Sequence, residues 1–174
     1  MPRFAAAPWS LAVRIMSVLG TVVLLVMSWF LHRQIPHGTR VPYAEAFGTA
    51  MVAVPPLILL GAALFVVRGY RFEGTALLVE RLAWSTRVEL AGLERAWHDP
   101  AAMCRSVRVF GNGGLYSITG VLRNTGLGTY RAYATDPKMS VVLRTPAKVV
   151  VVTPADPEAF LDQVRMLFPR ARQF

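Results

Sequence analysis

The stretch with the clearest potential for ligand chemistry is glycine-rich and runs from Gly111 to Asp136. A loop that binds a dinucleotide phosphate needs Gly-x-Gly-x-x-Gly between a strand and a helix. Gly111 and Gly113 fit the first two positions, but Tyr116 occupies the third, and the following LYSITGVL is typical of a strand. The Gly-Lys-Ser/Thr of a Walker loop does not occur. We therefore predict that GNGG and the later RNTGLG are hairpin turns, where glycine adopts positive φ without steric cost.

Two features of this region could still contact a phosphate. Exposed backbone amides at a glycine turn can bind a lipid headgroup phosphate. Basic side chains are also dense here, and each contributes about 1 kcal/mol close to an anionic membrane surface. A solvated sheet face with cross-strand ion pairs is the alternative explanation of these charges. The candidate contacts for anionic headgroups or for a protein partner are Arg105, Arg108, Arg123, Arg131 and Lys138.

The sequence shows no arrangement of residues typical of an enzyme. Gly-x-Ser-x-Gly and His-Glu-x-x-His are both missing, and His32, His37 and His98 have no ligand spacing with Cys104, the only cysteine. We expect a non-enzymatic protein with no cofactor and no metal site. The net charge of +9 is compatible with nucleic acid, but no recognition helix accompanies it, so no nucleic-acid partner is expected.

The composition instead indicates a membrane protein. Hydrophobic residues make up 54% of the chain and charged residues 17%, against about 25% in average soluble chains. The first uncharged apolar run is Ile15 to Leu31, and with the residues before it the run can cross a hydrocarbon core of about 30 Å. A cleaved signal peptide is the alternative, but no small-x-small cleavage site follows the run. We predict a membrane helix over about residues 12–32.

A second uncharged run extends from Ala46 to Val67 and contains Pro55 and Pro56. The prolines remove two backbone donors and crowd the preceding turn, so a kink is expected. A separate helix from Pro55 to Val67 would be only about 20 Å long, too short to cross the membrane. We predict one kinked span over about residues 46–67, and whether its kink serves function stays open.

The distribution of arginines predicts the orientation of these spans. Arg33 and Arg40 lie between the two runs, whereas six arginines flank their outer ends: Arg3, Arg14, Arg68, Arg71, Arg81 and Arg87. Positive residues accumulate on the cytoplasmic side. We therefore expect a multi-pass protein of the inner cell membrane with both termini in the cytoplasm.

After Arg68 the sequence changes to short runs rich in Val, Thr and Tyr, separated by turn residues. These runs predict an antiparallel sandwich or small barrel. They are TALLVERL, STRVEL, GLERAW, RSVRVF, LYSITGVL, GTYRAYAT, MSVVLRT and KVVVVT.

The chain ends in a predicted amphipathic helix. Asp156 suits the N-cap and Pro157 the first helical position. An apolar stripe then follows at helical spacing, formed by Phe160, Leu161, Val164 and either Leu167 or Phe168. We expect this stripe to pack across the sheet or the barrel opening.

Three segments in this order resemble the bacterial pleckstrin-homology-like (PH-like) family, within it the group that has membrane helices before the domain. They are YRFEGTALLVERLAWSTRVELAGLERA, RVFGNGGLYSITGVLRNTGLGTYRAYATD and VVLRTPAKVVVVTPADPEAFLDQV. The resemblance covers about residues 69–168. It implies a partly open barrel of about seven antiparallel strands, capped by the C-terminal helix. The expected organisation is a membrane anchor over 1–68 and a PH-like domain over 69–174.

These observations predict a mainly-β PH-like module carried by two membrane helices. We expect the module to interact with the membrane surface or with a protein partner, in addition to the lipid bilayer around the helices. The alternative is a small accessory subunit of a membrane transport or secretion complex.

Overall fold

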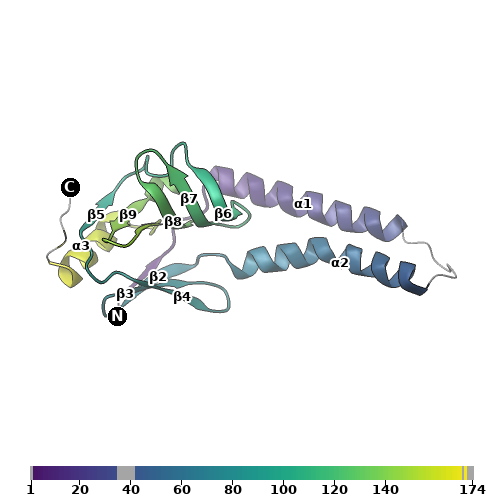
Figure 1. Cartoon of the computed structure of the whole chain (residues 1–174), viewed down its shortest axis with the longest axis horizontal. Coiled ribbons are helices and arrows are strands. Elements are labelled where there is room, and N and C mark those ends of the chain that lie inside the picture. The colour runs from purple at the N-terminus through teal and green to yellow at the C-terminus, as the bar shows by residue number, and fades with distance from the viewer. Residues whose placement is uncertain (1, 35–41, 170, 172–174) are drawn as a thin grey trace.

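A computed structural model describes residues 2–34, 42–169 and 171. Two long helices, α1 (Leu11–Gln34) and α2 (Pro42–Leu64), run side by side away from a β-rich domain (Figure 1). Both are long and apolar enough to cross a membrane, and most of their side chains are exposed. The two predicted helices are confirmed, although α2 ends at Leu64 rather than at Val67. Arg40, counted above in the orientation, lies outside the described residues.

Pro55 and Pro56 lie inside one continuous helix, as predicted. Because Pro56 has no N–H, the carbonyl group of Val52 has no donor within its own helix. The Ser28 hydroxyl group of α1 donates a hydrogen bond to this carbonyl oxygen at 2.8 Å. A polar contact between the helices thus satisfies the backbone group that the proline leaves free, as apolar surroundings require.

The domain contains two sheets. The first has the order β1 (Arg3–Ala5), β2 (Gly69–Glu73), β3 (Ala76–Glu80), β4 (Ser85–Glu89), and all its pairs are antiparallel. The second has the order β5-β9-β10-β8-β7-β6. Its strands are β5 (Arg95–His98), β6 (Val107–Gly113), β7 (Ile118–Asn124), β8 (Gly128–Ala134), β9 (Val141–Arg144) and β10 (Val149–Val152).

All eight predicted β-like runs contain a strand, and the fold class is confirmed. Two details differ from the expectation. The described part of the chain has ten strands rather than about seven. Each of the eight runs forms one strand, and β1 and β2 are additional to them. The pair β8–β10 is parallel, because the chain reverses once between β8 and β9 and again between β9 and β10.

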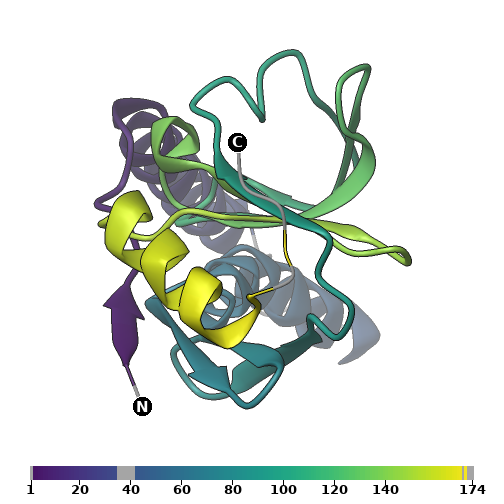
Figure 2. The same ribbon diagram turned by 90° about the vertical axis from the view of Figure 1, so that its left-hand side faces the viewer.

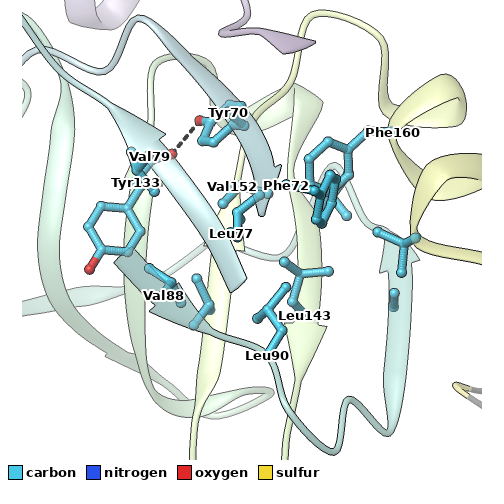
Figure 3. Close-up of a cluster of buried hydrophobic side chains, with 14 of the residues drawn as sticks. Tyr70, Phe72, Leu77, Val79, Val88, Leu90, Tyr133, Leu143, Val152 and Phe160 are labelled. Atoms are coloured by element: carbon cyan, nitrogen blue, oxygen red, sulfur yellow. Dashed lines mark hydrogen bonds between the residues drawn. The ribbon is translucent and has the colours of Figure 1, made fainter. Parts of the chain in front are cut away.

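The main hydrophobic core lies between the two sheets (Figure 3). Strand β10 shows why a run of valines is needed: Val150 and Val152 face this core, while Val151 packs in a second cluster on the other face of the sheet. A strand covered on both faces is continuously apolar instead of alternating. The second cluster is completed by Ala102 from the segment that joins β5 to β6.

Helix α3 (Pro157–Leu167) covers the end of the domain that is opposite to the membrane helices (Figure 2). The Asp156 carboxylate accepts hydrogen bonds from the amides of Glu158 and Ala159, at 3.1 and 3.0 Å. The predicted apolar stripe is confirmed: the buried residues of the helix are Pro157, Phe160, Leu161 and Val164. Of the two alternatives at its end, Phe168 packs against the core and Leu167 is exposed.

The N-terminal segment belongs to the domain, which sequence analysis did not predict. Strand β1 pairs with β2. The next residue, Ala6, forms an isolated antiparallel bridge with Pro154, just after the end of β10. The Phe4 ring packs edge-on against Phe160, with ring centroids 5.2 Å apart. The first residues thus fill the junction between β2, β10 and α3 before α1 begins.

Buried hydroxyl groups hold this junction together. The Tyr70 hydroxyl group donates to the Tyr133 carbonyl oxygen at 2.6 Å (Figure 3). It also accepts from the Thr153 amide at 3.0 Å. The Thr135 hydroxyl group donates to the carbonyl oxygen of Ala7 at 2.6 Å. Burial of Tyr70 disfavours its phenolate form and raises its pKa to about 12.

We predict that Phe160→Ala destabilises the domain by about 3–5 kcal/mol, because it leaves a cavity between α3 and both sheets. Glu158→Ala, an exposed position in the first turn of the same helix, should cost less than about 1 kcal/mol. Thermal unfolding of the full chain in mild detergent should therefore separate the variants by more than about 10 °C. Equal melting temperatures would show that α3 does not complete the core.

The second prediction concerns β1. Phe4→Ala should destabilise the domain by roughly 1–2 kcal/mol, because the ring is half-buried against Phe160. Arg3→Ala is the matched control, since its side chain is exposed and its ion pair with Glu80 is worth about 0–1 kcal/mol. If Phe4→Ala melted no lower than Arg3→Ala, the N-terminal strand would not contribute to the packed domain.

The third prediction follows from Tyr70. Its pKa is about 10 in the unfolded chain and about 12 in the folded one, so the folded state holds the proton more tightly. The contribution of the Tyr70 proton to the free energy of unfolding is therefore fully present below pH 10. Roughly 2–3 kcal/mol of it is lost as pH rises from 10 to 12. Tyr70→Phe should be less stable at pH 8 but lack this loss. Parallel curves of unfolding free energy against pH for both proteins would contradict the assignment.

Candidate functional site

Hydrogen bonds join both long helices to the domain where they meet it. The tip of the β6–β7 hairpin packs against the second and third turns of α1. The Ser17 hydroxyl oxygen accepts a hydrogen bond from the Tyr116 amide at 2.8 Å and lies 3.2 Å from the Gly114 carbonyl oxygen. The hydroxyl groups of Thr21 and Tyr116 are 2.8 Å apart. Two hydroxyl groups, four residues apart on one face of α1, thus hold the hairpin tip.

The hairpin tip adopts a conformation that these contacts support. Tyr116 has a φ of 65°, which is costly for a residue other than glycine. The side-chain oxygen of Asn112 accepts from the amides of Gly114 and Leu115. Since Ser17 takes the amide of Tyr116, these three amides of the tip are already bonded. The hypothesis that amides of this turn contact a headgroup phosphate is therefore not supported for these three groups.

The glycines of the GNGG segment have separate roles, which corrects the prediction of one common turn. Of these glycines only Gly114 lies in the turn, with a φ of 133°, although Gly111 also has a positive φ, of 114°. Gly111 lies within β6, opposite Gly120 of β7, and a Cβ on either one would collide with backbone of the facing strand. Gly113 ends β6 with an ordinary φ, and its neighbour is the flexible Arg108 guanidinium. The strands need Gly111 and Gly120 for their close approach.

Two side chains, one next to a strand of each sheet, cap the C-terminal end of α2. The carbonyl oxygen of Phe65 accepts hydrogen bonds from Arg81 Nη1 at 2.6 Å and from the Ser117 hydroxyl group at 3.3 Å. Arg81 is only 8% exposed, and its guanidinium also stacks near the rings of Phe65 and Tyr133. Burial lowers the pKa of Arg81 from its ordinary value. A buried cation at a helix C-terminus interacts favourably with the helix dipole.

A cleft of about 600 Å³ lies between the C-terminal part of α2 and strands β6, β7 and β8. Its lining contains two arginines, Arg81 and Arg131, and otherwise uncharged residues. The other lining residues are Ile58, Gly61, Ala62, Phe65, Phe110, Gly111, Asn112, Leu115, Thr119, Gly120, Val121 and Tyr133. A mostly apolar cleft with few charged groups is the usual form of a small-molecule site.

A second, more polar hollow of about 740 Å³ lies beside β1 and the β3–β4 turn. Glu80 stands in its lining and forms an ion pair with Arg3 at 2.8 Å and a longer contact with Arg71 at 3.8 Å. Its positive charges are therefore partly neutralised. The cleft beside α2, in contrast, has no carboxylate in its lining.

The five basic residues that the sequence singled out do not form one patch. Arg123 on β7 and Arg131 on β8 lie on the same face of the sheet, because Arg131 pairs with Val121, two residues before Arg123. Arg108 pairs with Leu122 and so belongs to the opposite face. Arg105 precedes β6, and Lys138 is exposed in a short 3₁₀ helix between β8 and β9. Only Arg131 of the five lines the cleft.

Large apolar side chains are exposed around the cleft. Phe110 is 77% exposed on β6, next to Val107 and Val109, which are also exposed. On the other side Leu82 and Trp84 are exposed in the β3–β4 turn, and Trp84 packs edge-on against Phe65 at the end of α2. Apolar surface of this kind marks a protein or membrane contact.

Sequence reasoning missed Arg81, Ser17 and Tyr116 as members of this region. Arg81 had been counted only as a positive charge, and its capping role depends on a contact 16 residues away. The hydroxyl groups of Ser17 and Thr21, at helical spacing in an otherwise apolar run, were the available signal. Among the described residues, no group of three His, Cys, Asp or Glu side chains is placed to hold a metal ion.

Comparison with known proteins agrees with this architecture. A family model described as Bacterial PH domain matches residues 68–167, which is more than half of the chain. No curated protein and no solved structure matches the chain. The matched region begins directly before β2 and includes both sheets, apart from β1, as well as α3. The chain therefore belongs to the bacterial PH domain family.

Proposed function

We propose that this chain is a non-enzymatic integral membrane protein that holds its PH domain against the cytoplasmic surface of the inner membrane. There the domain interacts with the membrane surface or with a protein partner. The observation that carries this proposal is the direct attachment of the domain to both helices. Ser17 and Thr21 contact the β6–β7 hairpin on α1, and Arg81 with Ser117 caps α2.

The fold and the charges together support the proposed orientation. Because β1 pairs with β2, the residues before α1 and those after α2 lie on the same side of the helical pair (Figure 1). This is also the side of the six arginines counted above, whereas Arg33 lies in the last turn of α1 and Arg40 follows it in the sequence. The positive-inside rule then favours a cytoplasmic domain.

The surface around the cleft supports a membrane-surface role. Aromatic and aliphatic side chains such as Phe110 and Trp84 are exposed near the end of α2, where the interface between lipid and water would lie. Arg131 stands on the adjoining sheet face and lines the cleft. Amphipathic rings and basic side chains together favour the headgroup region of an anionic membrane.

The alternative function, an accessory subunit of a membrane transport or secretion complex, is favoured by β6. This strand is an edge strand of the six-stranded sheet, and its side chains Val107, Val109 and Phe110 are exposed. An apolar edge strand can pair with a strand of another protein. Purification of the full chain in mild detergent distinguishes the accessory subunit from the membrane-surface role. A stoichiometric protein partner that is lost in the Val109→Lys variant supports the accessory subunit. If no such partner co-purifies, the membrane-surface role is favoured.

The fourth prediction concerns topology. A reporter that is active only in the periplasm should give no signal when fused after Phe174, because the domain is placed in the cytoplasm. The same reporter inserted between the helices, at Gly38, should be active and serves as the control. Residues 38 and 174 lie outside the described residues, so neither fusion point interrupts a described element. A strong signal from the C-terminal fusion would overturn the proposed orientation.

A further inference from the structure

The cleft beside α2 has two kinds of wall. On one side are Ile58, Gly61 and Ala62 of α2, and on the other are the strands with Val121 and Phe110. Arg131 of β8 completes the lining. One wall therefore belongs to a helix that is apolar enough to cross a membrane, and the other belongs to the PH domain.

The position of the cleft along α2 brings it to the boundary between hydrocarbon and headgroups. Ile58 and Leu64 are separated by about 9 Å along the helix axis, and the apolar span ends at Leu64. The α2 wall thus extends from the end of the span toward its middle. An acyl chain could lie along this wall, while a headgroup attached to it would reach the domain.

The charges of the cleft select an anionic headgroup. Arg131 is exposed and has no acidic partner among the described residues. Arg81 adds positive charge, although its Nη1 and Nε already bond the Phe65 carbonyl oxygen and the Thr86 hydroxyl group. With no carboxylate in the lining, nothing there compensates these two charges.

Gly61 leaves space at the helix wall. A Cβ built on this residue would meet no atom within 4 Å, so the volume beside it is open. The cleft is therefore open on the α2 side, at the level where lipid surrounds the helix.

We propose that this cleft binds one anionic glycerophospholipid, with an acyl chain along Ile58, Gly61 and Ala62 and with the phosphate at Arg131. This inference rests on the proposed membrane placement of the chain and assigns a ligand class to the junction between α2 and the domain. Arginine suits a phosphate because its guanidinium donates two parallel hydrogen bonds. The apolar walls give a lipid an advantage that a free phosphate does not have.

The test uses the full chain, freed of lipid in mild detergent, and counts bound lipids by native mass spectrometry. The probes are phosphatidylglycerol, phosphatidylcholine with the same acyl chains, and inorganic phosphate. We expect one phosphatidylglycerol per chain, with phosphatidylcholine at least about fivefold weaker, as for about 1 kcal/mol per basic residue. Equal binding of both lipids, or binding of inorganic phosphate as tight as that of the lipid, would overturn the proposal.

Three variants locate the site. Gly61→Trp should fill the open space and abolish binding of phosphatidylglycerol, whereas Arg131→Gln should weaken it at least about fivefold. Arg123→Gln is the matched control, because it removes the same charge from the same sheet face outside the cleft, and its affinity should stay within about twofold of wild type. Equal weakening by Arg131→Gln and Arg123→Gln would show a diffuse basic surface instead of a site.

Two measurements keep the result interpretable. The melting temperature of each variant shows whether the domain is folded, and if Gly61→Trp fails to fold, the comparison of Arg131→Gln with Arg123→Gln decides. Extraction of membranes with alkaline carbonate tests the membrane placement separately. A chain that stays in the membrane and binds no phosphatidylglycerol would refute this inference alone, whereas a chain released by carbonate would refute the placement.

Discussion

The buried hydroxyl groups of Tyr70, Thr135 and Thr153 determine how the rest of the molecule is arranged. Tyr70 reaches from β2 to the backbone of β8 and of the residue after β10, and so links two sheets that share no strand pair. Thr135 extends the network to the carbonyl oxygen of Ala7, while the Ala7 amide donates to the Thr153 carbonyl oxygen. Buried polar groups are costly unless all are bonded, so this network permits one relative position of the sheets and the N-terminal segment.

That position in turn fixes the helices. Ser10 follows the network directly: its amide bonds the Thr135 carbonyl oxygen, and its hydroxyl group accepts from Val13 in the first turn of α1. Where α2 joins β2, the Arg68 amide donates to the Glu80 carbonyl oxygen. The Phe65 carbonyl oxygen there accepts from the Arg81 guanidinium. Both links between helices and domain are therefore short and hydrogen-bonded. The position of the domain relative to the two helices is a property of the fold and needs no additional tether.

The sequence predicted the elements whose signals are local. The helix α3 was located by Asp156 and Pro157 and by apolar spacing, and the valine run of β10 was recognised as a strand. Strand β1 could not be predicted, because three residues carry no periodicity and its pairing with β2 spans more than sixty residues of sequence. The same holds for Arg81 and for the pairing of Gly111 with Gly120: their roles come from contacts between distant segments. The candidate site was thus predicted only through Arg131, one of five basic residues named.

The glycine-rich segment illustrates why residue type alone did not identify the site. Its glycines allow two strands to approach closely, and the amides at its tip are bonded to Asn112 and Ser17. A phosphate at this junction would therefore be bound by a side chain rather than by the loop backbone. Gly111 and Gly120 still contribute, because they line the cleft and their close pairing positions the two strands that form its wall. A side chain at either position would push the facing strands apart, and the wall of the cleft would shift with them.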